Sequence, residues 1–154
     1  MAQPVAQEDP IEIHQHLLDE TGAAYLARDF DRFARCFELP LTIGSFDGDR
    51  QVGTEAELRA VFDGIVTYMA RHRFSDIVRR SILAEWRGAN VISATHETRW
   101  LRADHVSRAP YPAHSVLHRG ADGHWRVADS SYAISGIPAF SPLPRQVPAG
   151  EPRK

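Results

Sequence analysis

Two side chains in the last third of the chain, His114 and Asp129, form a pair suited to proton transfer. Desolvation on an apolar wall would raise the pKa of the carboxyl group, and a protonated imidazole beside it would lower that pKa again. Such a pair can pass a proton near neutral pH, while His96 or His72 donates one to a carbonyl or leaving hydroxyl oxygen. These four residues, with Tyr25 reaching in from the helical side, are our catalytic candidates for a lyase or isomerase that needs no cofactor.

Three predicted strands, at residues 90–102, 111–119 and 125–134, would position these groups. In the first strand the even-numbered residues, His96 among them, share one face because side chains alternate with a period of two. The other two strands flank Asp122-Gly123, a pair typical of a tight hairpin. We therefore expect these two strands to pair directly.

The register of this hairpin decides which side chains share a face. A two-residue loop places Val116 opposite Asp129 and His114 opposite Ser131, whereas a four-residue loop places His114 opposite Asp129. Both registers leave Arg119 and Arg126, which are costly to bury, on the other face. A three-residue bulged loop would invert the faces. We expect an inward face made of His114, Val116, His118, Trp125, Val127, Asp129 and Ser131.

Aromatic side chains would complete the pocket. Trp100 and Trp125 are flat apolar walls suited to a ring-shaped substrate, with Val116 and Ser131 beside them. The sequence has no glycine-rich phosphate loop and no nucleophile-elbow motif, so neither nucleotide use nor serine hydrolysis is expected. Three histidines and an aspartate could bind zinc, but they lie on separate elements without a short ligand spacing, so no metal is predicted.

The same side chains also have structural explanations. A histidine on a strand face is commonly a hydrogen-bonded core residue, His118 near the hairpin end would be half-exposed, and Asp129 could pair with an arginine. Only the gathering of several polar groups on one wall favours chemistry. A non-catalytic module that binds a ligand, or forms a homodimer through the outer sheet face, is the alternative. That outer face would carry Glu97, Arg99, Arg119 and Arg126.

Composition indicates one soluble globular domain. The chain has 154 residues, of which 43% are hydrophobic and 25% charged, and a formal net charge of −2. Its scattered arginines disfavour nucleic-acid binding, which needs a concentrated basic surface. No stretch approaches the roughly 18 apolar residues of a membrane span, and the polar, acidic start does not resemble a secretory signal, so a cytoplasmic location is expected. The lone Cys36 excludes internal disulfides.

Helical patterns precede the strands. After a flexible tail over residues 1–10, apolar residues at helical spacing predict a helix over 11–27. Asp29 would cap a second helix that ends before Pro40. Thr54 and Glu57 form a capping box in front of a third apolar stripe.

The remaining segments complete an α+β domain over residues 11–135. Asp47-Gly48 predicts a short hairpin, and residues 74–86 read as a strand whose inner face is ambiguous. Residues 136–154 hold five of the ten prolines, which predicts an irregular tail with Ile137, Phe140 and Leu143 available to dock. We expect a strongly curved, mostly antiparallel sheet with three helices on its concave face.

Three stretches carry a resemblance to a known family: Tyr25 to Phe33, the helix from Thr54, and Asp122 to Val127. They resemble the nuclear transport factor 2-like (NTF2-like) superfamily and its SnoaL-like branch, over roughly residues 11 to 135. The resemblance implies a cystatin-like roll, a cone with a pocket between sheet and helices. The superfamily includes isomerases, dehydratases and non-catalytic dimerising modules, so the resemblance implies a fold rather than an activity.

Within that superfamily the pocket is similar to that of the scytalone dehydratases. Their helix tyrosine and their histidine before the third strand match Tyr25 and His72. Their second histidine matches His96 after a shift of about one residue, and His114 falls where they carry an amide. The sequence departs from them at Leu26, where they have a carboxylate. It also lacks the carboxylate base that ketosteroid isomerases carry on the first strand.

Overall fold

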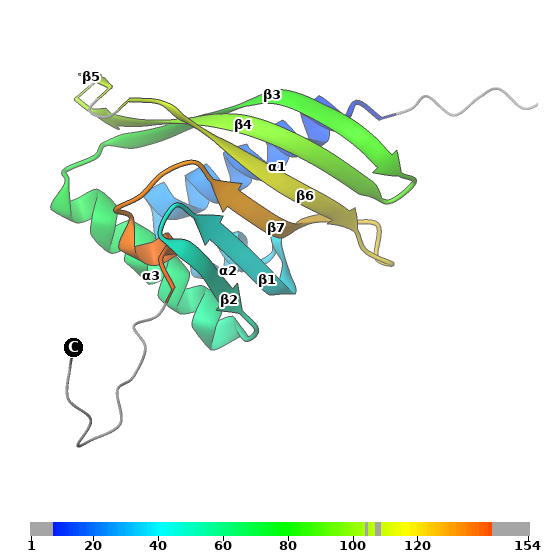
Figure 1. The fold of residues 1–154 in the computed structure, drawn as a ribbon, viewed down its shortest axis with the longest axis horizontal. Helices are drawn as coiled ribbons and strands as arrows, with labels where there is room; N and C mark the ends of the chain where they lie inside the picture. Colours follow the sequence, from blue (N-terminus) through cyan, green and yellow to red (C-terminus); the bar gives the residue numbers. More distant parts are fainter. Residues whose placement is uncertain (1–7, 104, 107–108, 143–154) are drawn as a thin grey trace, which may run out of the picture.

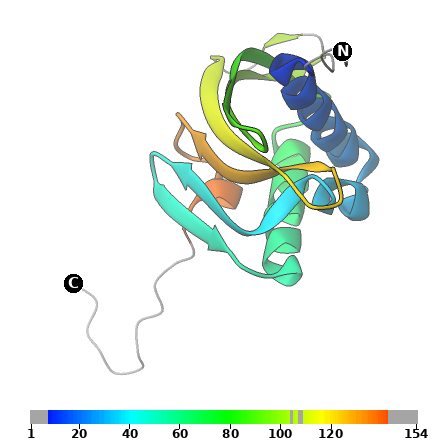
Figure 2. The ribbon, with the colours of Figure 1, turned by 90° about the vertical axis from the view of Figure 1, so that its right-hand side faces the viewer.

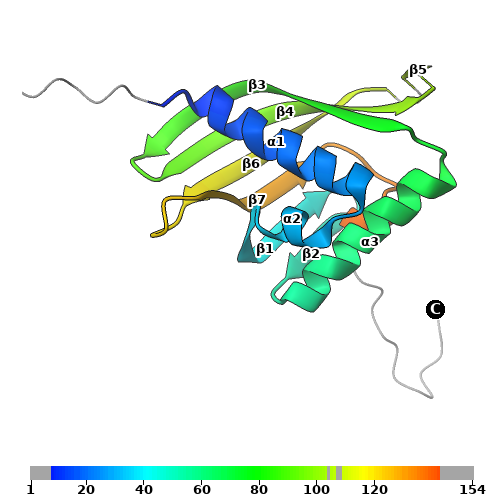
Figure 3. The same cartoon turned by 180° about the vertical axis from the view of Figure 1, so that it is seen from behind.

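The computed structural model describes residues 8–103, 105–106 and 109–142, which form a mixed sheet with helices on one face (Figure 1). Figure 3 shows the three α-helices lying side by side against that face. The predicted α+β arrangement is confirmed, and the strong curvature of the sheet stays a prediction. The elements are α1 (Pro10–Ala27), α2 (Phe30–Ala34), β1 (Phe37–Ser45), β2 (Gly48–Val52), α3 (Glu55–Arg71), β3 (Asp76–Gly88), β4 (Val91–Arg102), β5 (His105–Val106), β6 (Tyr111–Arg119), β7 (Trp125–Tyr132) and the 3-10 turn η1 (Pro138–Phe140).

The strands follow the order β2-β1-β7-β6-β4-β3, and β5 pairs with β4 away from this path. Neighbouring strands are antiparallel except for β1 and β7, which run parallel. β3 is therefore an edge strand among the described residues. None of the described helices is long and apolar enough to cross a membrane.

Local sequence signals set the helix ends. Asp9 accepts a hydrogen bond from the Ile11 backbone N–H at 2.9 Å and starts α1, with Pro10 in the first turn. The predicted capping box is present, because the Thr54 hydroxyl accepts from the Glu57 backbone N–H at 3.2 Å. These caps satisfy backbone donors that a helix start otherwise leaves unpaired.

The second helix is shorter than predicted. It ends at Ala34, and Phe37 already belongs to β1. The cause is strand pairing: Phe37 pairs with Val127, whose N–H donates to the Cys36 carbonyl at 2.7 Å. Tertiary pairing here overrides the helical spacing of the phenylalanines.

The β6–β7 hairpin has the bulged loop rather than either expected loop. The Gly120 N–H donates to the His124 carbonyl at 2.9 Å, and Gly123 adopts a φ of +83°. A three-residue loop ending in such a residue offsets the pairing by one position. Leu117 consequently pairs with Val127, and a bulge follows at Ala128.

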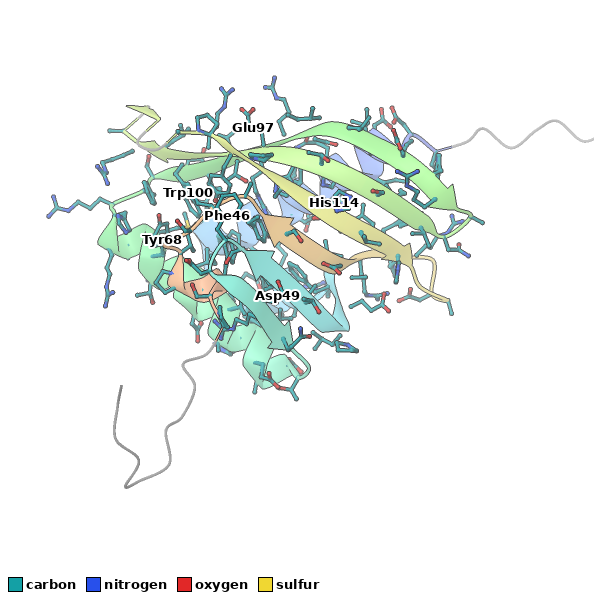
Figure 4. The ribbon with its side chains drawn as sticks, viewed as in Figure 1. Phe46, Asp49, Tyr68, Glu97, Trp100 and His114 are labelled. Carbon is teal, nitrogen blue, oxygen red and sulfur yellow. The ribbon has the colours of Figure 1, made fainter. Side chains whose placement is uncertain are left out.

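The predicted inward face is wrong for β6 and for Asp129 and Ser131 of β7, whereas Val127 is buried as predicted. Tyr111, Ala113, Ser115 and Leu117 point inward instead, because these odd-numbered residues bury more apolar area. The expected pairs of His114 with Ser131 and of Val116 with Asp129 do form. Their side chains lie on the outer face, where His114 is visible in Figure 4 and both His114 and Asp129 are exposed.

The other two long strands orient as their alternation predicts. In β4 the even-numbered residues, including His96, Thr98 and Trp100, are buried, as expected. In β3, whose face the sequence left open, Arg79 and Ser81 lie on the side that α1 covers, up to a bulge that follows Ser81. Trp100 packs beneath the sheet beside Tyr68 of α3, with ring centroids 5.4 Å apart (Figure 4).

The side chain of Gln15 fastens α1 to the free edge of β3. Its amide nitrogen donates to the Arg79 carbonyl at 2.9 Å, and its amide oxygen accepts from the Ser81 N–H at 2.8 Å. One side chain thus replaces two hydrogen bonds that a neighbouring strand would supply.

After β7 the chain crosses back over the helical side. Ile137 and Phe140 are buried there, and η1 packs on α3 (Figure 2). Arg50 anchors this segment by donating to the Ala139 carbonyl at 3.0 Å. We call residues 136–141 the C-terminal strap. Leu143, the third predicted docking residue, lies outside the described residues.

Candidate functional site

A small cavity of about 10 Å³ lies between the sheet and the helices. That volume corresponds to about one water molecule. Two of the predicted site residues, Tyr25 and Trp100, line it. The complete lining is Tyr25, Ile65, Ile77, Arg79, Thr98, Trp100, Tyr111, Tyr132 and Phe140.

Unpaired buried polar atoms lie at this cavity and beside it. Thr98 lines the cavity, and among the described residues its hydroxyl, the two ring nitrogens of His96 and His14 Nε2 have no hydrogen-bond partner. Each of these three side chains is at most 2% exposed, and the two imidazole centroids are 5.5 Å apart. An unsatisfied buried polar group costs about 1–3 kcal/mol, so these atoms are expected to meet water or a ligand.

Arg79 supplies a fixed positive charge at the same place. One terminal nitrogen, Nη2, donates to the Leu18 carbonyl at 2.6 Å and to the Thr21 hydroxyl. Among the described residues, its Nε and Nη1 groups have no protein acceptor, and no carboxylate pairs with the guanidinium. We call His14, Arg79, His96 and Thr98 the interior polar cluster.

Burial and this charge set the protonation of the surrounding groups. Burial first, then the charges of Arg79 and His14, lower the pKa of His96 to about 2. Burial, then Arg79, lower the pKa of His14 to about 4. Burial raises the pKa of the Tyr25 and Tyr111 phenols. At neutral pH the site therefore combines uncharged imidazoles and protonated phenols with one cation.

The helical periodicity of α1 positions His14 in the cluster. His14, Leu18, Thr21 and Tyr25 recur at spacings of four, three and four, which is one face of α1. Sequence reasoning missed His14 although it shares this face with Tyr25. It missed Arg79 because the pattern of β3 did not reveal its inner side.

The remaining predicted site residues lie elsewhere. His72 ends α3 and is exposed, stacked 5.4 Å from the Phe74 ring. His114 Nε2 lies 2.7 Å from the Ser93 hydroxyl on the outer face. Trp125 packs near Trp86, away from the cavity. Of the predicted set, Tyr25 and Trp100 line the cavity, and His96 is buried beside it with its ring 6.2 Å from that of Tyr132. The other predicted site residues lie away from the cavity: His72, His114, Val116, Trp125, Asp129 and Ser131.

A larger open groove of about 780 Å³ runs between α1, α2 and the tip of the β6–β7 hairpin. Several of its charged side chains are already paired, as in the Arg32–Glu20 pair at 2.8 Å and the pair of Arg126 with the neighbouring Asp122 at 2.6 Å. We favour the interior because unpaired buried atoms gather there, whereas volume alone indicates no chemistry. No group of three or more His, Cys, Asp or Glu side chains in the described part of the chain could hold a metal ion.

Solved structures share this arrangement of helices and strands. An NTF2-like protein with a cystatin-like fold from Novosphingobium aromaticivorans superposes with a TM-score of 0.61 at 13% identity, covering 81% of each chain. The chain has the NTF2-like fold. That part of the predicted resemblance is confirmed.

Two further solved structures are similar to this chain. A ketosteroid isomerase-like protein from Erwinia carotovora atroseptica gives a TM-score of 0.56 at 12% identity, covering 84% of this chain and 100% of that one. LinA gives 0.59 at 14% identity, with 91% and 90% covered. No family model and no curated protein matches the sequence. At these identities the likeness establishes the fold alone.

Proposed function

We propose that this NTF2-like protein binds a small, cyclic, largely apolar molecule that carries an oxygen substituent, inside the cone between sheet and helices. One observation carries the proposal: the buried Thr98, whose hydroxyl has no partner among the described residues, lines a cavity with aromatic walls, and the unpaired His96 ring lies beside Tyr132 of one of those walls. Aromatic walls favour a ring, and the polar atoms favour an oxygen that donates or accepts hydrogen bonds.

A structural role explains these atoms less well. One buried water makes about three hydrogen bonds, and Thr98 and the two histidines offer four unpaired atoms. The ring of His96 lies 6.2 Å from that of Tyr132, which lines the cavity. A ligand oxygen together with water would satisfy the set.

The same groups support acid-base chemistry of the lyase or isomerase class within the SnoaL-like branch. A neutral His96 can accept a proton, the phenol of Tyr25 can donate one, and Arg79 can stabilise an oxyanion. This assignment keeps Tyr25 and His96 as catalytic candidates and replaces His114 and Asp129 by Arg79. The reaction needs no cofactor in this form.

The test is calorimetric titration with a panel of cyclic ketones, phenols and lactones. Thr98→Val removes the unpaired hydroxyl while keeping the shape, so we expect about tenfold weaker binding of any ligand found, the value of one hydrogen bond. Thr95→Val, on the outer face of the same strand, is the control and should bind like the wild type. Equal affinity of all three proteins, or no ligand in the panel, would contradict the proposal.

The second candidate function is a homodimer formed through the outer sheet face. Val78, Ile82 and Leu83 of β3 are 37%, 56% and 51% exposed. Contact with a second copy of the chain would remove these apolar side chains from water. Ile82→Lys should convert a dimer to a monomer in sedimentation equilibrium. Ile11→Lys, at a similarly exposed isoleucine of α1, should leave the mass unchanged. A monomeric wild type would rule this candidate out.

A further inference from the structure

Phe140 occupies a place in the cavity wall that a ligand ring could take. Its ring stacks on Tyr132 with centroids 4.1 Å apart and planes 6° from parallel. Every other lining residue belongs to an α-helix or a strand, whereas Phe140 comes from the C-terminal strap. The helices and strands that form the rest of the wall do not include the strap, although its displacement would expose the buried Ile137 and Phe140.

The strap is held by a few separable contacts. Arg50 donates to the Ala139 carbonyl, and the Gly136 N–H donates to the Asp47 carboxylate at 2.8 Å. The strap lies close to α3 because Gly64 has no side chain: a Cβ there would come within 3.0 Å of the Ala139 Cβ. Removal of the Phe140 ring would give the cavity room for a six-membered ring, since an apolar cavity of about 150 Å³ holds benzene.

Another part of the cavity wall is charged and polar. Arg79 lines the cavity, its Nε and Nη1 groups have no acceptor among the described residues, and no acidic side chain lines the cavity. Thr98, 2% exposed, adds an unpaired hydroxyl. A planar carboxylate matches a guanidinium fork better than a neutral oxygen does.

We propose that the ligand is a planar aromatic carboxylate, whose ring replaces that of Phe140 on Tyr132 and whose carboxylate pairs with Arg79 and Thr98. This inference rests on the proposed interior binding site and specifies its ligand class. The strap then acts as an internal substitute for the ring, and ligand entry requires its displacement. The wild type binds such ligands less tightly than a protein without the Phe140 ring.

Benzoate and its neutral analogue benzamide are the probes, in calorimetric titrations of the full chain. Phe140→Ala should bind benzoate at least about tenfold more tightly than the wild type, and benzoate more tightly than benzamide. Arg79→Met in that background should abolish the preference for benzoate. Phe46→Ala, at an exposed phenylalanine, is the matched control and should behave as the wild type.

The wild type provides a readout that does not depend on a foldable variant. Saturating benzoate should increase hydrogen exchange in residues 136–141, because the strap leaves when the ring enters. Benzamide bound as tightly as benzoate would overturn the carboxylate inference and leave the proposed interior site intact. If neither probe binds Phe140→Ala and the strap of the wild type does not respond, the carboxylate inference fails. The proposed interior site is then tested separately by the calorimetric titrations with neutral cyclic molecules.

Discussion

At the scale of single residues, the two buried imidazoles are the most informative groups. The ring centroids of His14 and His96 are 5.5 Å apart, and of their four nitrogens only His14 Nδ1 has a partner among the described residues, the Ser81 hydroxyl at 2.7 Å. Both stay neutral because burial and Arg79 penalise their charged forms. Stability therefore has to depend on pH.

The free energy of unfolding should fall as the pH drops below about 6.5, the ordinary histidine pKa. The folded-state pKa values of about 4 for His14 and about 2 for His96 lie below the unfolded value. Between pH 6.5 and 4 the unfolded chain thus binds more protons than the folded one. For each imidazole, the free energy of unfolding falls by up to about 1.4 kcal/mol per unit decrease in pH. Urea unfolding at several pH values measures this slope.

His14→Gln isolates one contribution, since the amide still reaches Ser81 but cannot be protonated. The slope between pH 6.5 and 4 should decrease by up to about 1.4 kcal/mol per pH unit. His16→Gln, at an exposed histidine of the same helix, should leave the slope unchanged. Equal slopes in both variants would show that His14 is not held neutral by burial.

The periodicity of the sequence correctly predicted some of the buried residues, but the hairpin loop led to a wrong prediction for others. The alternation of β4 correctly buried His96 and Trp100, and helical spacing placed Tyr25 inward. The prediction failed for His114 because Asp122-Gly123 also fits a three-residue loop with Gly123 in the left-handed region. It failed for Asp129 because the bulge at Ala128 turns the following residues of β7 over. The choice of loop depends on burying Leu117, a tertiary effect absent from the loop itself.

At the scale of elements, the Gln15 amide joins α1 to the edge of β3. Gln15→Ala removes both hydrogen bonds to the edge of β3, so the free energy of unfolding should fall by about 1–3 kcal/mol. Gln51→Ala, at an exposed glutamine whose oxygen accepts only from Thr42, should cost much less. Urea denaturation of the two variants is the measurement. Similar losses in both would mean that the edge contact adds no stability.

Element types were predictable, and their ends were less so. The capping box of α3, the Asp47-Gly48 hairpin and the four long strands follow from local signals. The end of α2 could not be predicted from local signals. Phe37 has the spacing of a helical residue but pairs with Val127 of β7. A sequence pattern contains no information about this partner, which lies far along the chain.

At the scale of the whole molecule, the NTF2-like fold has three regions where a ligand could bind, and each contains a different pair of histidines. His14 and His96 lie in the interior, His16 and His124 line the open groove, and the outer sheet face carries His114 and His118. Ligand binding to any one region would perturb a different pair. The histidines therefore report directly which region is the binding site.

Long-range 1H–15N spectra of histidine-labelled protein, recorded during titration with cyclic carbonyl compounds, phenols and benzoate, test the central claim. The account predicts that the ring signals of His14 and His96 shift with added ligand while the other described histidines do not. Shifts confined to His16 and His124, or to His114 and His118, would contradict it and move the site out of the cone.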